Sequence, residues 1–304
     1  MHTCLPTFAA HLPSAAWGGA AIDAGIHALL GASPLAKVAL GDGFGRDLSA
    51  EGAHWERFRA ELGAADGTAM LDVGKLYTES VLLLRAIAAS DTSVEAAEVL
   101  TLAPATAGDL SALPPHSELS AHAMSQGGVV ILREPRSSMT AVVAIPPART
   151  EHVWNVRLFS EVPMAPQAPS ISHATAELTD SVHGAAEIIA ASSGAFRAGE
   201  GSAPAMPENM PTDLPSAFGG RAAQLIERAD TIENIRMMAN AAESRRGAPA
   251  EQQPALWKLQ SAVNLARRAA VSGFAAEQLE QFRARSGSAN SPAYRDPNAQ
   301  SWAN

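Results

Sequence analysis

The sequence has little charge, few aromatic residues and a single cysteine. Charged residues make up 17% of its 304 positions and aromatic residues 5%, whereas 47% are hydrophobic. An average globular protein carries about 25% charged residues. The hydrophobic content excludes a wholly disordered chain, which needs low hydrophobicity and high net charge. We therefore expect one large or two ordinary folded domains with a surface that is poor in charge.

The scarcity of cysteine and lysine excludes further classes of protein. Cys4 is the only cysteine, so an internal disulfide and a zinc site built from cysteines are excluded. Lys37, Lys75 and Lys258 are the only lysines, so nearly all the positive charge is arginine. The net charge of -9 argues against a surface that binds nucleic acid, because such a surface needs a basic patch.

Marks of export and of membrane insertion are also missing. No lysine or arginine precedes Lys37, and Pro6, Pro13 and Gly18 interrupt the N-terminal segment, which argues against a secretory signal. No run of about 18 or more apolar residues occurs. We predict a protein without a membrane partner that is neither secreted by a recognisable signal nor transmembrane, and that resides in the cytoplasm or in a virion.

Hydrophobic periodicity predicts helices over most of the chain, with one short block of strands. Residues 128–163 hold β-branched segments separated by turn residues, which predicts a small antiparallel β meander. A short connection separates the last two helices, which predicts a C-terminal helical hairpin. The fold class is therefore α+β and predominantly α-helical. The predicted helices cover residues 20–31, 50–62, 68–89, 172–193, 217–246 and 254–285.

Three local signals add detail to this prediction. Residues 36–40 have the composition of a strand. Thr92 and Glu95 have the spacing of a capping box, in which each side chain bonds to the other residue's backbone amide. Residues 103–127 are rich in proline and glycine and are predicted to be a loop.

The patterns divide the chain into four regions. Residues 1–124 form an N-terminal helical region, and residues 125–168 form the meander packed on helices. Residues 169–285 form a C-terminal helical region, in which the proline- and glycine-rich residues 196–216 are predicted to be a linker. Residues 286–304 form an extended tail.

A glycine-rich segment after the predicted strand is the first candidate ligand site. Gly41, Gly43 and Gly45 are spaced like the glycines of phosphate-binding loops. Arg46 stands where a dinucleotide-binding fingerprint needs a small residue, and no Lys-Ser or Lys-Thr pair follows. An ordinary turn is the simpler interpretation, and the sequence leaves ligand binding by the Gly41 to Gly45 loop open.

The helix predicted over residues 172–193 offers the second candidate. His173, Glu177, Asp180 and His183 fall within about a third of the helix circumference. Two imidazoles and two carboxylates on one face are ligands that a divalent metal accepts. A solvent-exposed polar face gives the same pattern and is the favoured interpretation. We therefore assign no catalytic residue, no metal and no cofactor from the sequence.

Arginines gather in the C-terminal hairpin, where glutamates are interleaved with them. We expect them to form helix salt bridges and to bond to backbone carbonyls, rather than to bind RNA. The arginines concerned are Arg245, Arg246, Arg267, Arg268, Arg283 and Arg285.

These features favour a non-enzymatic structural subunit that self-assembles, most concretely a capsid or shell protein of a virus or phage. Interfaces between permanent partners resemble a protein core and are depleted in charge, as this sequence is. Tyr294 and Trp302 are isolated aromatic residues in the tail, and we expect them to anchor an extended arm on an adjacent subunit. The expected partners are other copies of the chain, or a second structural protein, and no sequence-specific nucleic acid.

Two other classes of function stay open. The first is a bacterial adaptor or regulatory binding protein that uses the hairpin of residues 217–285 as a helix-in-groove surface. The second is a metal-dependent hydrolase that uses His173 and His183. The mass of the native particle separates self-assembly from a one-to-one adaptor, and elemental analysis tests the hydrolase.

Overall fold

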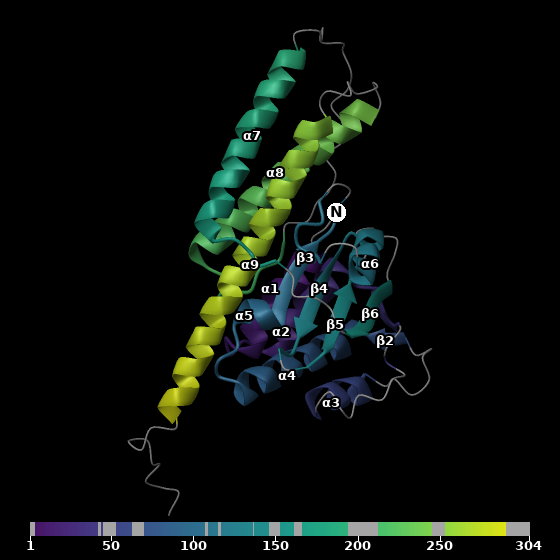
Figure 1. Ribbon diagram of the computed structural model, residues 1–304, viewed down its shortest axis with the longest axis vertical. Helices are drawn as coiled ribbons and strands as arrows, with labels where there is room; N and C mark the ends of the chain where they lie inside the picture. The colour runs from purple at the N-terminus through teal and green to yellow at the C-terminus, as the bar shows by residue number, and fades with distance from the viewer. Residues whose placement is uncertain are drawn as a thin grey trace, which may run out of the picture.

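A six-stranded sheet and three long helices are the two main parts of the structure (Figure 1). The structure is a computed structural model that describes residues 4–41, 44, 53–62, 70–106, 109–114, 117–135, 137–145, 153–160, 166–193, 212–244 and 253–289. Its fold class is α+β and mostly helical, so the prediction from the sequence is confirmed. None of the helices in these ranges is long and apolar enough to cross a membrane.

The sheet is mixed, and its strands follow the order β2-β1-β6-β5-β4-β3. Neighbouring strands are antiparallel except β1 and β6, which run parallel. The predicted meander is present as β4, β5 and β6, and three strands from earlier in the chain extend it. Residues 1–124 and 125–168 therefore share one sheet. The strands are β1 (Lys37–Leu40), β2 (Met70–Asp72), β3 (Leu100–Pro104), β4 (Gly128–Arg133), β5 (Met139–Ala144) and β6 (Val153–Ser160).

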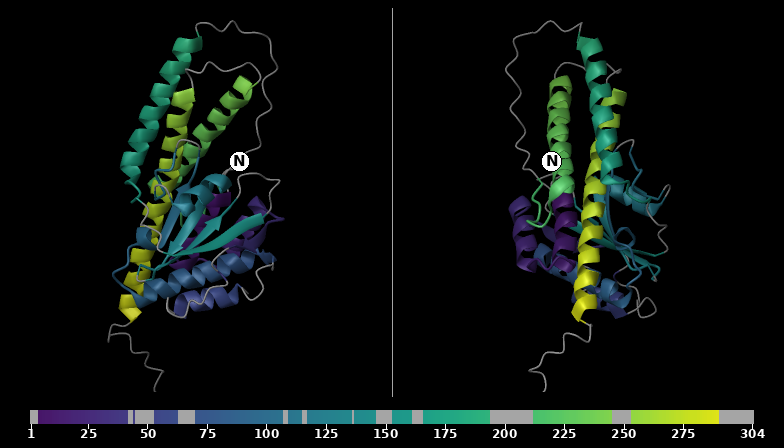
Figure 2. Two further views of the ribbon diagram at one scale, coloured as in Figure 1. Left: turned by 45° about the vertical axis from the view of Figure 1, so that its right-hand side comes forward. Right: turned by 90° about the vertical axis from the view of Figure 1, so that its left-hand side faces the viewer.

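Side chains alternate along the strands and form two cores of unequal size. On β4, Val130 and Leu132 belong to the main core, whereas Val129 and Ile131 belong to a smaller core on the other face. The main core contains residues of α1, α4 and α9, and α6 covers the smaller core (Figure 2). These helices are α1 (Cys4–Ala16), α4 (Val73–Ser90), α6 (Glu118–Gln126) and α9 (Gln253–Ala289).

Shorter helices complete the body around the sheet. α2 packs on α1 and α4, α3 packs on α4, and α5 leads into β3 and contacts α9. The helix predicted over residues 68–89 begins only at Val73, because residues 70–72 form β2. The remaining bounds are α2 (Ile22–Ala32), α3 (Ala53–Glu61) and α5 (Ala96–Val99).

α1, a deeply buried helix near the N-terminus, was not predicted from the sequence. Every residue of α1 after Cys4 is buried. The Phe8 ring packs edge-on against Tyr77 at 6.0 Å and against Trp154 at 5.7 Å, between ring centroids. Its polar residues Thr7, His11 and Ser14 are buried as well, so α1 lacks the contrast between an exposed polar face and a buried apolar face that marks a surface helix. Pro13 lies inside the helix and further obscured it.

Two local predictions were wrong. The capping box lies three residues later than predicted, since the Glu95 amide donates to Glu98 Oε2 at 2.9 Å. Residues 103–127 are not all loop, because β3 ends at Pro104 and α6 fills residues 118–126. Gly127 adopts a left-handed φ of 76° and ends α6, so it is a helix C-cap and not a loop residue. The strand predicted at residues 36–40 is present as β1.

The three long helices form a bundle that projects from the sheet, which we call the helical projection: α7 (Ile171–Ser193), α8 (Gly220–Ser244) and the N-terminal half of α9. α7 and α8 run away from the sheet in the same direction, and α9 returns antiparallel to both (Figures 1 and 2). The predicted hairpin is thus present as α8 and α9, with α7 as a third helix. The C-terminal half of α9 lies along α1, α5 and β3 and joins the projection to the body.

Candidate interaction surface

A buried polar cluster fixes the base of the helical projection. Arg267 of α9 donates from Nη2 to Asp230 Oδ1 of α8 at 2.6 Å, and the two side chains are 4% and 12% exposed. The Thr212 amide donates to the other oxygen of Asp230 at 3.0 Å. One turn before Arg267, Asn264 donates to Asp109 Oδ2 at 3.0 Å. These groups satisfy one another inside the chain, so the cluster positions α8 and α9 and offers no open site.

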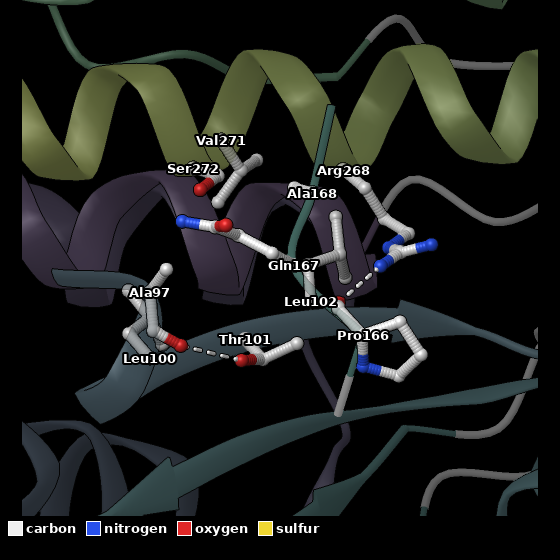
Figure 3. A pocket seen from close by; sticks show the side chains of 10 residues that line it. All are labelled: Ala97, Leu100, Thr101, Leu102, Pro166, Gln167, Ala168, Arg268, Val271 and Ser272. Atoms are coloured by element: carbon white, nitrogen blue, oxygen red, sulfur yellow. Dashed lines mark hydrogen bonds between the residues drawn. The ribbon is translucent and has the colours of Figure 1, made fainter. Parts of the chain in front are cut away.

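A small pocket beside this cluster lies between α9, β3 and the segment before α7 (Figure 3). Arg268 donates from Nη2 to the Pro166 carbonyl at 2.9 Å, and Thr101 donates to the Ala97 carbonyl at 3.1 Å. Burial lowers the pKa of the Arg268 guanidinium, and the nearby Asp109 carboxylate acts in the opposite direction. The pocket encloses about 20 Å³, roughly the space of one water molecule. It is too small for a substrate.

The other C-terminal arginines that the structure describes also make internal contacts. Arg283 donates to the Val94 carbonyl, and Arg285 donates to the Trp17 carbonyl. These two bonds join the end of α9 to the body, whereas Arg267 joins α9 to α8 and Arg268 joins it to the segment before α7. Arg245 and Arg246 lie outside the described residues.

A groove of about 490 Å³ lies between α7 and α8. Both helices pack along α9 but make few contacts with each other, so the groove is open on the side away from α9. Arg221 and Arg228 are exposed on α8 and lie seven residues apart, which places them about two turns apart on one side of the helix. Neither guanidinium has a hydrogen-bond or ion-pair partner among the described residues. The groove is lined by Ile171, Ser172, Thr175, Arg221, Gln224, Leu225 and Arg228.

Each helix of the projection also exposes one large apolar side chain. Ile188 of α7 is 40% exposed, Ile235 of α8 is 55% exposed and Trp257 of α9 is 56% exposed. Ile235 follows Arg228 by seven residues, so it continues the row of Arg221 and Arg228 along the groove side of α8. An exposed large apolar side chain beside a groove, as Ile235 is, is a candidate for contact with another protein.

The four residues considered as metal ligands lie together on α7, but the helix spreads them along its length. His173 and His183 are ten residues apart, which is about 15 Å along a helix axis. That separation prevents both from binding one zinc ion at a bond length of about 2 Å. The described part of the chain contains no group of three or more His, Cys, Asp or Glu residues that could hold a metal ion. Glu177 and Asp180 instead give α7 an acidic side, and α7 contains no lysine or arginine.

The remaining candidate residues lie mostly outside the described residues. Gly41 is described, and its amide donates to the Val156 carbonyl at 2.7 Å beside β6. Gly43 and Gly45, the greater part of the glycine-rich segment, fall outside, as do Tyr294 and Trp302 of the tail and residues 196–211 of the predicted linker.

The groove was not predicted from the sequence. The seven-residue spacing of Arg221 and Arg228 is visible in the sequence, but interleaved acidic residues on α8 hid their isolation from any acidic partner. No family model, curated protein or solved structure matches the chain. The surface of the projection therefore has to be interpreted from its own chemistry.

Proposed function

We propose that the protein is a non-enzymatic structural subunit that self-assembles through its helical projection, in the setting of a viral or phage capsid or shell. The observation that carries this proposal is the surface of the projection, where an open groove lies beside exposed Ile235 and holds two arginines without a partner among the residues that the structure describes. The low charge of the sequence supports it, because surfaces buried between permanent partners are depleted in charge. We propose the cytoplasm or the virion as its location.

The native mass of the purified chain, measured by light scattering over a range of concentrations, tests this proposal. We expect particles of two or more copies. Ile235→Ser combined with Trp257→Ser should reduce the native mass, because each large apolar side chain buried in an interface contributes about 1.5–3 kcal/mol. Leu35→Ser is the matched control, since Leu35 is 66% exposed but lies in the body, before β1. A wild-type chain that stays monomeric at high concentration would contradict self-assembly.

An adaptor that binds a helix of a different protein is the second candidate. The observation that favours it is the groove between α7 and α8, which is open along the side away from α9 and has the polar and apolar lining of a helix-binding groove. A monomeric wild-type chain that forms a defined one-to-one complex with another protein would favour this function over self-assembly.

A further inference from the structure

We infer that the groove between α7 and α8 is the contact between two copies of the chain, and that the acidic side of α7 from one copy packs against the α8 arginines of the other. This inference rests on the proposed self-assembly and specifies its interface. The occupant of the groove is thus a helix of a second, identical chain.

The shape of the helical projection leaves room for such a helix. α7 and α8 are parallel and both pack on α9, yet they make few contacts with each other. Packed helices lie about 8–10 Å apart and are most stable when their apolar sides are covered. A fourth helix laid along the groove would complete a four-helix arrangement. The part of Ile171 that is still exposed at the groove would then be covered, whereas Leu225 is already buried in the single chain.

The charges on α7 cannot neutralise the arginines of their own groove. Thr175 marks the groove side of α7. At about 100° per residue, Glu177 lies about 160° and Asp180 about 140° around the helix from Thr175. The two carboxylates therefore point away from Arg221 and Arg228 of the same chain, which explains why neither arginine has a partner among the described residues. The acidic side of α7 can therefore attract the two arginines of α8 only when the two helices belong to different copies of the chain.

A two-fold axis parallel to the helical projection brings these surfaces together. The four helices then lie in the order α8, partner α7, α7, partner α8, so each α7 sits between the other copy's α7 and α8. Thr175 and Arg228 line the same part of the groove, so the acidic side of the other α7, which begins at Glu177, lies level with Arg228. Ile188 follows farther along that side and lies toward Ile235, and both are exposed in the single chain. Such an interface is self-complementary, as closed dimers require.

A charge-swap experiment on the full chain tests the inference. Variant one carries Arg221→Glu and Arg228→Glu, and variant two carries Glu177→Arg and Asp180→Arg. In a dimer of either variant alone, like charges face each other at both contacts between α7 of one copy and α8 of the other. We therefore expect the dissociation constant, measured by analytical ultracentrifugation, to rise at least tenfold. When the two variants are mixed in equal amounts, a dimer with one copy of each has opposite charges at both contacts between α7 and α8. We expect its association to return to near the wild-type level.

The control has the same change in net charge as variant one and lies on the body. Lys37→Glu with Lys75→Glu changes two exposed cations on β1 and α4, and we expect its association to match the wild type. Circular dichroism of every variant verifies that the helices are intact.

The outcomes separate this inference from the proposed function. A monomeric wild-type chain overturns both. Assembly that neither charge variant weakens overturns the groove interface and leaves self-assembly standing. Variants that each weaken assembly but fail to restore it when mixed overturn the pairing of α7 with α8.

Discussion

Removal of the Asp230 carboxylate should destabilise the protein by about 3–4 kcal/mol. Arg267 donates to Asp230 Oδ1 from both Nε, at 3.2 Å, and Nη2, at 2.6 Å, and its side chain is only 4% exposed. Asp230→Ala leaves this guanidinium buried without its counterion, and breaking a buried pair on one side costs about 3–5 kcal/mol. The Thr212 amide also loses its acceptor, but Asp230 is 12% exposed, so water replaces part of that bond. Such a loss is a large share of a typical stability of about 5–15 kcal/mol.

Urea unfolding followed by circular dichroism measures this loss, and a second substitution tests its cause. Arg267→Met removes the charge but keeps an apolar side chain of similar length, and Asp230 keeps its bond from Thr212. We expect this variant to lose only about 1–2 kcal/mol. The double variant Asp230→Ala with Arg267→Met should be more stable than Asp230→Ala alone, because no uncompensated charge is left. A double variant that is less stable than Asp230→Ala would refute the reasoning.

Three further predictions concern the body and the candidate metal site. Gly25→Ala should lower the free energy of unfolding by about 1–3 kcal/mol, because a Cβ there would lie 2.2 Å from Tyr77 Oη. Gly31→Ala in the same helix is the control, since a Cβ there meets no atom within 4 Å. Urea unfolding should show it to be neutral or slightly stabilising. Burial, and then the charge of Arg157, lower the pKa of His122 from 6.5. The unfolded state therefore binds more protons, and stability should fall as the pH drops below about 6.5. His122→Phe should reduce that fall, and an unchanged pH dependence of the urea midpoint would contradict the assignment. The four candidate metal ligands are spread along the length of α7, so elemental analysis should find no stoichiometric metal. Added zinc should not raise the melting temperature, and a zinc-dependent rise would contradict this prediction.

Periodicity in the sequence identified the elements that have one polar and one apolar face. α7, α8 and α9 are long and amphipathic, and the meander strands alternate or are β-branched, so their patterns were visible without the structure. α1 is buried on all sides and carries no Asp, Glu, Lys or Arg, and α5 is only one turn long, so neither was recognised from the sequence. β2 was hidden because its residues merge into the helical pattern of α4. The parallel pairing of β1 with β6 depends on contacts between distant segments, which periodicity does not encode.

The polar side of α7 was predictable from the sequence, but the groove beside it was not. The sequence singled out His173, Glu177, Asp180 and His183 as one polar side of a helix, and the structure places all four on α7. Whether that side faces a metal, water or another protein depends on the neighbours of α7. The groove itself arises from the distance between α7 and α8, which α9 sets by packing against both.

The low charge of the sequence has a different significance once its charges are placed. Arg267 pairs with Asp230, and Arg268 and Arg283 donate to backbone carbonyls, so all three make contacts within the chain. In the helical projection α7 carries only acidic charges, whereas α8 carries both signs and has Arg221 and Arg228 on its groove side. An acidic side on α7 and two arginines on the groove side of α8 favour one specific partner orientation, because like charges oppose the alternatives. The scarcity of charge and the placement of these charges therefore favour the same conclusion, a pairing surface on the helical projection.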